Sequence, residues 1–178
     1  MFKTISLKKR LMPVNNSGPN FEELVTRQLQ LHGIKRINAK DISGFPNDII
    51  HSLYPEGIVS VGTNKYTSIY GNSNCRTEFV VYLPNKRTIR IECKWQQTEG
   101  TAAEKIPYFY LNFVENRFPE DTLILIYGGG ASSFSNAINW LKSAWKKRLY
   151  IKKDFDKDLK IFSLDEFIAW TNNLKIKD

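Results

Sequence analysis

Apolar residues recur at helical spacing near the start of the chain, at Phe21, Leu24, Val25, Leu29 and Leu31. Asn20 is a favourable N-cap residue, and Glu22 falls in the first turn, where the helix dipole favours negative charge. Gly33 is a typical residue just beyond a helix end. The pattern therefore predicts a helix over residues 20–32.

A β-hairpin is the clearest local structure in the rest of the sequence. Residues 78–83 form one strand-like run, residues 84–86 read as a turn, and residues 87–96 read as the return strand. In the return strand, apolar residues alternate with charged ones, which indicates one core face and one polar face.

The second half of the chain alternates between strands and helices. Residues 121–127 are short and almost wholly apolar, which is typical of a strand buried on both faces. Pro107 favours a helix that begins near it and runs to about residue 117. Further elements follow: an amphipathic helix with Phe134, Ile138, Leu141 and Trp145 inside, a strand at 160–162, and a last helix capped by Ser163 and Glu166.

Residues 34–76 are harder to interpret, because Pro46, Pro55 and several glycines interrupt them. A short strand is expected at 57–61. Beyond it, rings and cations are interspersed at Lys65, Tyr66, Tyr70 and Arg76. This segment is either a nucleic-acid contact loop or an ordinary polar loop with packed tyrosines. The order of elements predicts an α/β (α+β) domain with a central mixed sheet flanked by helices.

Charge points to a polyanionic partner. The chain has 178 residues, enough for one domain, and a formal net charge of +8. Residues 1–19 read as a basic arm with Lys8, Lys9 and Arg10, followed by a single domain over 20–178. A second cluster includes Lys142, Lys146, Lys147, Arg148, Lys152 and Lys153. Converging clusters would form a phosphate-binding face.

No apolar run is long enough to cross a bilayer, and no signal-peptide pattern follows the N-terminal basic residues. Cys75 and Cys93 form neither a disulfide framework nor a CxxC zinc pattern. We therefore expect a soluble, cytoplasmic protein with reduced thiols.

The candidate chemistry lies in Glu92-Cys93-Lys94, at the end of the return strand. Residues two apart on a strand share a face, so Glu92 and Lys94 lie together while Cys93 points into the core. Tight pairing of the hairpin brings Glu78 to the same end. The two carboxylates and the Cys93 carbonyl would then supply oxygen ligands for Mg²⁺, with Lys94 beside the metal-bound water.

Two observations argue for caution. An acid-x-Lys tripeptide arises by chance, and the chain contains a second one, Asp158-Leu159-Lys160, in a charged run expected to be a solvated connection. The alternative for Glu78, Glu92 and Lys94 is a cross-strand salt-bridge cluster on a solvated face.

These residues resemble the PD-(D/E)XK nuclease superfamily, which includes restriction enzymes, Holliday junction resolvases and phage nucleases. The resemblance runs from residue 20 to the end of the chain and is strongest over 78–110. The family's first hairpin acid, usually an aspartate, corresponds to Glu78, and its acid-x-Lys pair corresponds to Glu92 and Lys94. Gln96 matches a glutamine that some members carry, and Glu22 matches a first-helix glutamate.

The resemblance implies a restriction-endonuclease-like core and an Mg²⁺-dependent DNA endonuclease, with Mn²⁺ as a possible substitute. It implies that Glu78 and Glu92 bind the metal with the Cys93 carbonyl, and that Glu22, Lys94 and Gln96 assist catalysis. A homodimer is expected, because cutting two strands needs two sites or two visits. The alternative is an inactive DNA-binding or structural protein on the same fold. Expected DNA contacts are Lys8, Lys9, Arg10, Lys65, Arg76, Lys105, Lys146 and Lys147.

Overall fold

A computed structural model describes residues 18–71 and 75–173 and shows one six-stranded mixed sheet in the order β1-β2-β3-β4-β5-β6. The pairs β2–β3 and β3–β4 are antiparallel, whereas β1–β2, β4–β5 and β5–β6 are parallel. The strands are β1 (Lys35–Asn38), β2 (Ile58–Tyr66), β3 (Cys75–Tyr82), β4 (Thr88–Trp95), β5 (Thr122–Gly128) and β6 (Asp158–Ser163). The helices are α1 (Gly18–Leu31), η1 (Ala39–Ile42), α2 (Asn47–Leu53), α3 (Ala102–Val114), α4 (Ser132–Lys146) and α5 (Leu164–Asn172).

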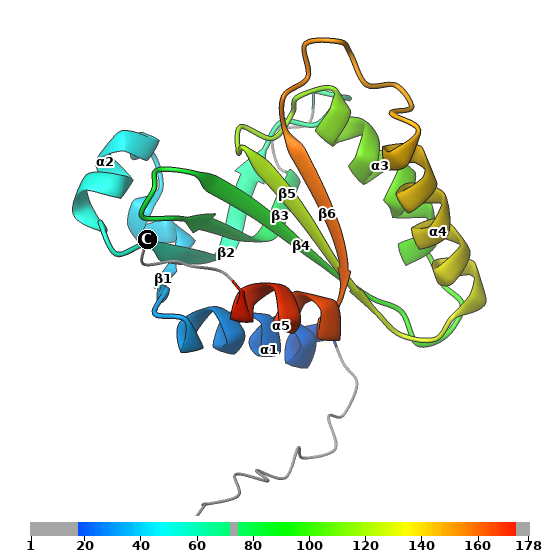
Figure 1. Ribbon diagram of the computed structural model, residues 1–178, viewed down its shortest axis with the longest axis horizontal. Helices are drawn as coiled ribbons and strands as arrows, with labels where there is room; N and C mark the ends of the chain where they lie inside the picture. Colours follow the sequence, from blue (N-terminus) through cyan, green and yellow to red (C-terminus); the bar gives the residue numbers. More distant parts are fainter. Residues whose placement is uncertain (1–17, 72–74, 174–178) are drawn as a thin grey trace, which may run out of the picture.

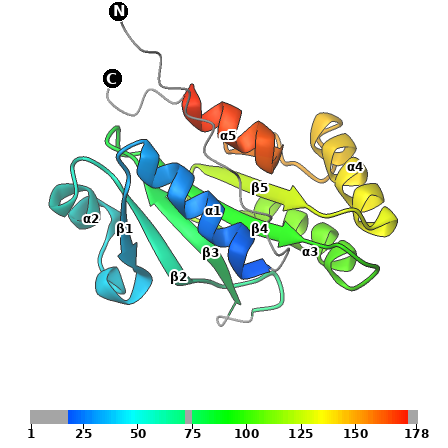
Figure 2. The ribbon, with the colours of Figure 1, turned by 90° about the horizontal axis from the view of Figure 1, so that it is seen from below.

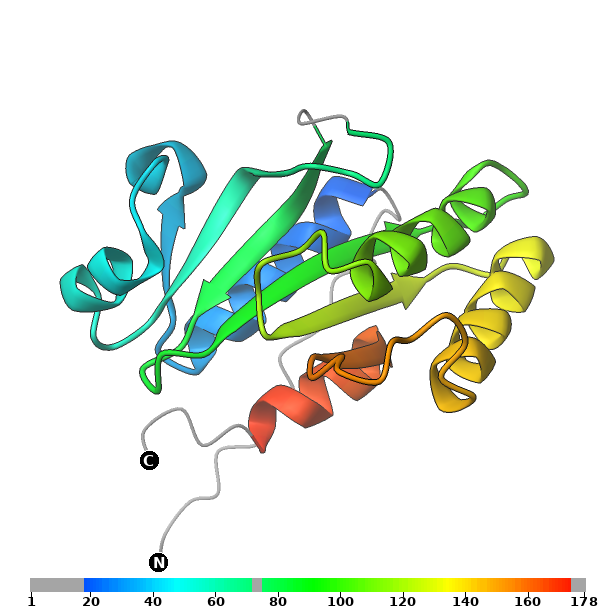
Figure 3. The same cartoon turned by 90° about the horizontal axis from the view of Figure 1, so that it is seen from above.

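Helices cover both faces of the sheet (Figure 1). On one face α1 lies along β3 and β4, with α5 beside it (Figure 2). On the other face α3 and α4 pack over β4, β5 and β6, while η1 and α2 lie at the β1–β2 end (Figure 3). The predicted α/β (α+β) architecture is therefore confirmed.

The predicted hairpin is confirmed as β3 and β4, although β3 begins three residues earlier than expected. Phe79 lies opposite Ile91 and Tyr82 opposite Thr88. The turn closes with a hydrogen bond of 2.9 Å from the Leu83 amide to the Arg87 carbonyl. The apolar members of β4 face the core under α1, so the alternation read from the sequence sets the orientation of the strand.

The central strand β5 is buried on both faces, as predicted. Ile124 and Ile126 pack against the α1 side, and Leu123 and Leu125 pack against the α3 side. The last helix, α5, begins with the predicted capping box of Ser163 and Glu166.

Two helix starts were predicted wrongly. The first helix begins at Gly18, so Asn20 lies inside its first turn. The helix α3 begins at Ala102 rather than near Pro107, because the Gln96 side chain accepts a hydrogen bond of 3.2 Å from the Ala103 amide and satisfies an early donor. The exposed ring of Pro107 is therefore accommodated within the helix.

The irregular region 34–76 holds more structure than predicted. It contains β1, η1 and α2, and the short strand expected at 57–61 extends to Tyr66. Lys65 and Arg76 were expected in a loop, but they face each other on paired strands. The charged run that ends at Lys160 was expected to be a solvated connection, but its end forms β6 along the sheet edge. Each of these elements depends on long-range pairing that local patterns do not report.

Candidate active site

The hairpin brings the predicted acids and lysine together at one end of the sheet. Glu92 and Lys94 lie near the end of β4, and Glu78 lies near the start of β3. The Cys93 amide donates a hydrogen bond of 3.0 Å to Glu78 Oε2, so the Glu78 side chain reaches across to β4. The local register of one hairpin therefore fixes three of the predicted site residues.

The ammonium of Lys94 is surrounded by three oxygen atoms. Its Nζ contacts Glu92 Oε1 directly, lies 3.4 Å from the Cys93 carbonyl oxygen, and lies 3.9 Å from Glu78 Oε1. These are the same three groups that the sequence predicts as ligands of a divalent cation. A positive charge is thus already held where oxygen donors from two strands converge.

The Glu92 carboxylate is buried rather than solvated, with only 6% of the residue exposed. Burial raises the pKa of Glu92 to about 8, with Lys94 acting against the shift and Glu78 adding to it. Its second oxygen, Oε2, is buried and has no hydrogen-bond partner among the described residues. The predicted alternative of a salt-bridge cluster on a solvated face is therefore wrong, because a buried oxygen of this kind is costly unless it binds something.

The helix α1 brings Glu22 toward this cluster. Phe21 packs against Trp95 at the end of β4, with ring centroids 5.3 Å apart, and this contact anchors the first turn of the helix. The pKa of Glu22 is raised first by burial and then by the nearby Glu78 carboxylate, while Lys94 opposes the shift. Glu22 therefore lies within electrostatic reach of both groups, as the sequence predicts.

Gln96 is buried but is bonded away from the carboxylates. Its amide nitrogen donates to the Gly100 carbonyl at 3.1 Å, and its amide oxygen accepts from Ala103. Its contacts hold the loop after β4 and the start of α3. The expected part of Gln96 in orienting the site remains a prediction, and it would act through this loop.

The second acid-x-Lys pair provides an internal comparison. Asp158 and Lys160 also share a strand face and lie 2.6 Å apart, Asp158 Oδ2 to Lys160 Nζ. They lie on the edge strand β6, and their side chains are 45% and 34% exposed. No second carboxylate contacts Lys160 in the part of the chain that the structure describes. Burial and a neighbouring acid thus distinguish the Glu92 pair.

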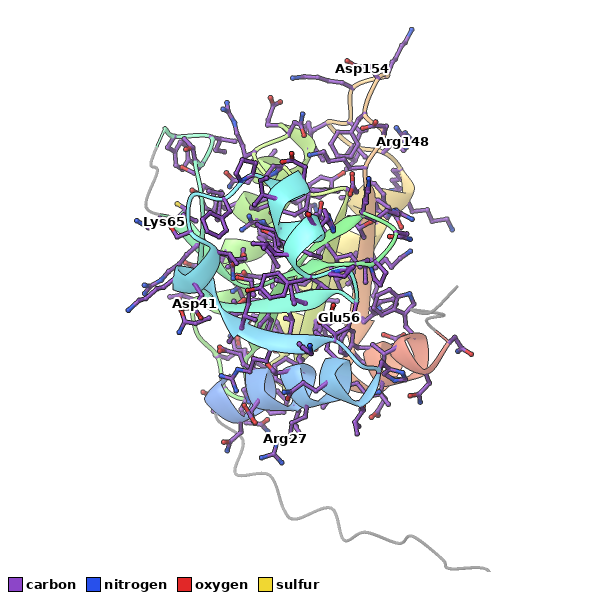
Figure 4. All side chains as sticks on the ribbon, turned by 90° about the vertical axis from the view of Figure 1, so that its left-hand side faces the viewer. Arg27, Asp41, Glu56, Lys65, Arg148 and Asp154 are labelled. Atoms are coloured by element: carbon purple, nitrogen blue, oxygen red, sulfur yellow. The ribbon has the colours of Figure 1, made fainter. Side chains whose placement is uncertain are left out.

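The predicted basic contacts do not all lie at this end. Lys65, Arg76 and Lys105 are exposed on β2, β3 and α3. Lys146 and Lys147 end α4, about 20 Å along its axis from Ser132, which is near the loop that follows β4. In Figure 4, Lys65 and Arg148, which follows Lys147, lie far apart. Lys8, Lys9 and Arg10 lie outside the described residues.

One contact next to the site was not predicted. Arg90 lies on the same face of β4 as Glu92 and forms a buried two-point ion pair with Glu120, at 2.6 and 2.7 Å. It also donates to Thr77 at 2.8 Å and to the Asn64 carbonyl at 3.0 Å, and so ties β4 to both preceding strands. The signal available in the sequence was an arginine at an inward position of a strand, but its partner is 30 residues away.

Comparison with known families decides the assignment. A family model described as the PD-(D/E)XK nuclease superfamily domain matches residues 14–175. The chain belongs to the PD-(D/E)XK nuclease superfamily. Neither the comparison with curated proteins nor the one with solved structures gave a match.

Members of the PD-(D/E)XK nuclease superfamily are generally nucleases that use divalent metals, so the fit of this site to such an ion matters. No group of three His, Cys, Asp or Glu side chains suited to a metal occurs within residues 18–71 and 75–173. The available donors are the carboxylates of Glu78 and Glu92 and the Cys93 carbonyl, all oxygens of the kind that Mg²⁺ prefers. The unpartnered Glu92 oxygen fits that demand. Among the described helices, none is both long and apolar enough to span a membrane.

Proposed function

We propose that this chain is a DNA endonuclease that depends on a divalent metal, Mg²⁺ or Mn²⁺. The observation that carries the proposal is the convergence of Glu78, Glu92 and the Cys93 carbonyl around one cationic centre, with a buried Glu92 oxygen left unpartnered. Glu78, Glu92 and the Cys93 carbonyl would hold the metal. A divalent metal bound there would lower the pKa of a coordinated water and polarise a phosphate oxygen.

The residues around the donors have separate tasks. Negative charge grows on the phosphate during hydrolysis, and the Lys94 ammonium is close enough to the donors to stabilise it. Glu22 adds a further carboxylate, acting directly or through water. The buried thiol of Cys93 has a pKa raised by burial, and it packs in the core away from this chemistry.

The proposal is tested by incubating supercoiled and branched DNA with Mg²⁺ or Mn²⁺. Wild type should cleave DNA, and Glu92→Ala and Lys94→Ala should each lose at least about a hundredfold in rate, the usual effect of removing one electrostatic contact to the transition state. Asp158→Ala and Lys160→Ala are matched controls, because they disrupt the other acid-x-Lys pair and should cleave like wild type. Intact DNA with the wild-type protein, or equal loss in the control variants, would refute the proposal.

The competing proposal is a DNA-binding protein without cleavage on the same fold. It predicts DNA binding that is unaffected by Glu92→Ala and no cleavage with either metal. The endonuclease proposal also includes a homodimer, so that two sites act on two strands, and a cytoplasmic location where chromosomal, mobile or phage DNA is accessible.

A further inference from the structure

Two tyrosines form an exposed aromatic stack beside the β2–β3 hairpin. Tyr70 is 79% exposed, and its ring lies on that of Tyr108, with centroids 5.4 Å apart and an interplanar angle of 20°. Tyr108 belongs to α3 and is half-buried. Because Tyr108 covers part of the Tyr70 ring, the remaining surface is an open apolar plane in contact with water.

The stack is held in place by a fully buried asparagine. Asn112 accepts a hydrogen bond of 2.9 Å from the Ile69 amide and donates one of 2.7 Å to the Tyr108 carbonyl. The Tyr70 amide donates to the buried Ser68 hydroxyl at 3.3 Å. The backbone on both sides of the stack is thus fixed through α3, so a ligand would pay little to order it.

The stack lies at the catalytic end of the sheet. The Tyr108 hydroxyl is 3.7 Å from the Cys75 sulfur, and Cys75 begins β3. Glu78 is three residues further along the same strand, a separation of about 10 Å. A nucleic-acid strand that reaches Glu78 can therefore reach the stack within a few nucleotides.

Unpaired cations surround the stack. Lys65 and Arg76 lie directly opposite each other on β2 and β3, and both are exposed, with Lys65 extending outward in Figure 4. Lys105 is also exposed and lies one helical turn before Tyr108, on the same side of α3. No carboxylate pairs with these three in the ranges 18–71 and 75–173. Like charges directly opposite each other destabilise a sheet, so this placement favours an anionic partner.

We propose that Tyr70, supported by Tyr108, stacks an unpaired base of the DNA substrate while Lys65, Arg76 and Lys105 bind the adjoining phosphates. Bases in an intact duplex are already stacked on their neighbours, so the open ring of Tyr70 suits only an unpaired base. The inference rests on the proposed function and specifies it: the substrate is DNA with unpaired nucleotides next to a duplex, such as a flap or a splayed end.

The test measures binding without cleavage, in EDTA, by fluorescence anisotropy. Wild type, Tyr70→Phe, Tyr70→Ala and Tyr150→Ala are compared on a labelled flap and on a fully paired duplex of the same duplex sequence. Tyr150 is 67% exposed and follows α4, so Tyr150→Ala controls for the loss of an exposed tyrosine. A 2-aminopurine base placed in the unpaired strand reports stacking directly through quenching.

Tyr70→Ala should weaken flap binding about tenfold and abolish the 2-aminopurine quenching, while leaving duplex binding unchanged. Tyr70→Phe and Tyr150→Ala should behave as wild type. Equal flap binding by wild type and Tyr70→Ala, or equal weakening on flap and duplex, would overturn the proposal. Because no metal is present, a protein that binds flaps through Tyr70 but never cleaves would contradict only the endonuclease proposal.

Discussion

Lys94 is the residue on which the candidate site turns, because its ammonium contacts the oxygens that would bind a metal. Burial opposes the charge of Lys94, but the Glu92 and Glu78 carboxylates raise its pKa above the ordinary value. The lysine is therefore charged, and it offsets the negative charge of the carboxylates. A divalent cation at the same oxygens would meet the electrostatic repulsion of this ammonium.

We expect Lys94→Met to bind Mg²⁺ or Mn²⁺ at least about threefold more tightly than wild type, because the variant keeps the length of the side chain and removes its charge. Cleavage by the same variant should fall by about a hundredfold or more. Isothermal titration calorimetry and a cleavage assay measure the two effects.

Lys160→Met is the control for this pair of measurements, and both of its values should match wild type. If Lys94→Met instead lost metal binding, Lys94 would be part of the metal-binding structure rather than a competing charge.

At the residue scale the sequence predicted the acids and the lysine but not their environment. Glu78, Glu92 and Lys94 come together because an antiparallel hairpin has only local degrees of freedom. The burial of Glu92 depends on the helices that cover the sheet, and these are distant in sequence. For the same reason the Glu120 partner of Arg90 was missed.

Among the elements, the turn from β5 to α4 requires glycine for a specific reason. Gly129 has a φ of +102°, and a Cβ added there would lie 2.0 Å from the Gln96 carbonyl oxygen. The sequence predicted a flexible strand–helix turn at residues 128–130. The structure shows instead a close approach of two backbones, which fixes the end of β4 next to the site.

Gly129→Ala should therefore destabilise the protein by about 2 kcal/mol or more, because strained positive φ and a backbone clash act together. Gly130→Ala is the matched control, since its nearest neighbour would be the end of the Gln97 side chain at 3.9 Å. Urea denaturation of both variants measures the difference. Equal midpoints and slopes would show that the turn adapts to a side chain.

Elements with strong periodicity were predicted well, and short ones were not. The burial of β5 and the capping box of α5 follow from composition and local hydrogen bonding. The strand β1 has four residues, three of which are exposed, so its sequence carries no alternation to detect. It exists because it pairs with β2.

Considered as a whole molecule, the protein has an exposed apolar row at the β1–β2 end. Phe45, Ile49 and Leu53 are spaced four residues apart around α2, and all three are exposed. A homodimer must bury some surface of this kind, because apolar area removed from water supplies most of the association energy.

We expect light scattering after gel filtration to give twice the chain mass, and Ile49→Glu to give the monomer mass. The control is Leu31→Glu, which adds the same charge at another exposed apolar residue and should leave the dimer intact. A monomer at every protein concentration would exclude the homodimer, and a dimer in both variants would place its interface elsewhere.

The sequence by itself determined the hairpin, its polar face and the superfamily, because alternation along a strand and a tight turn are encoded by neighbouring residues. Only the tertiary structure decided which carboxylates are buried, that Glu22 reaches the site through the Phe21–Trp95 contact, and that Lys146 and Lys147 lie far from it. Only the tertiary structure brought Tyr70 onto Tyr108. These features depend on packing between segments tens of residues apart, and no local pattern in the chain specifies such packing.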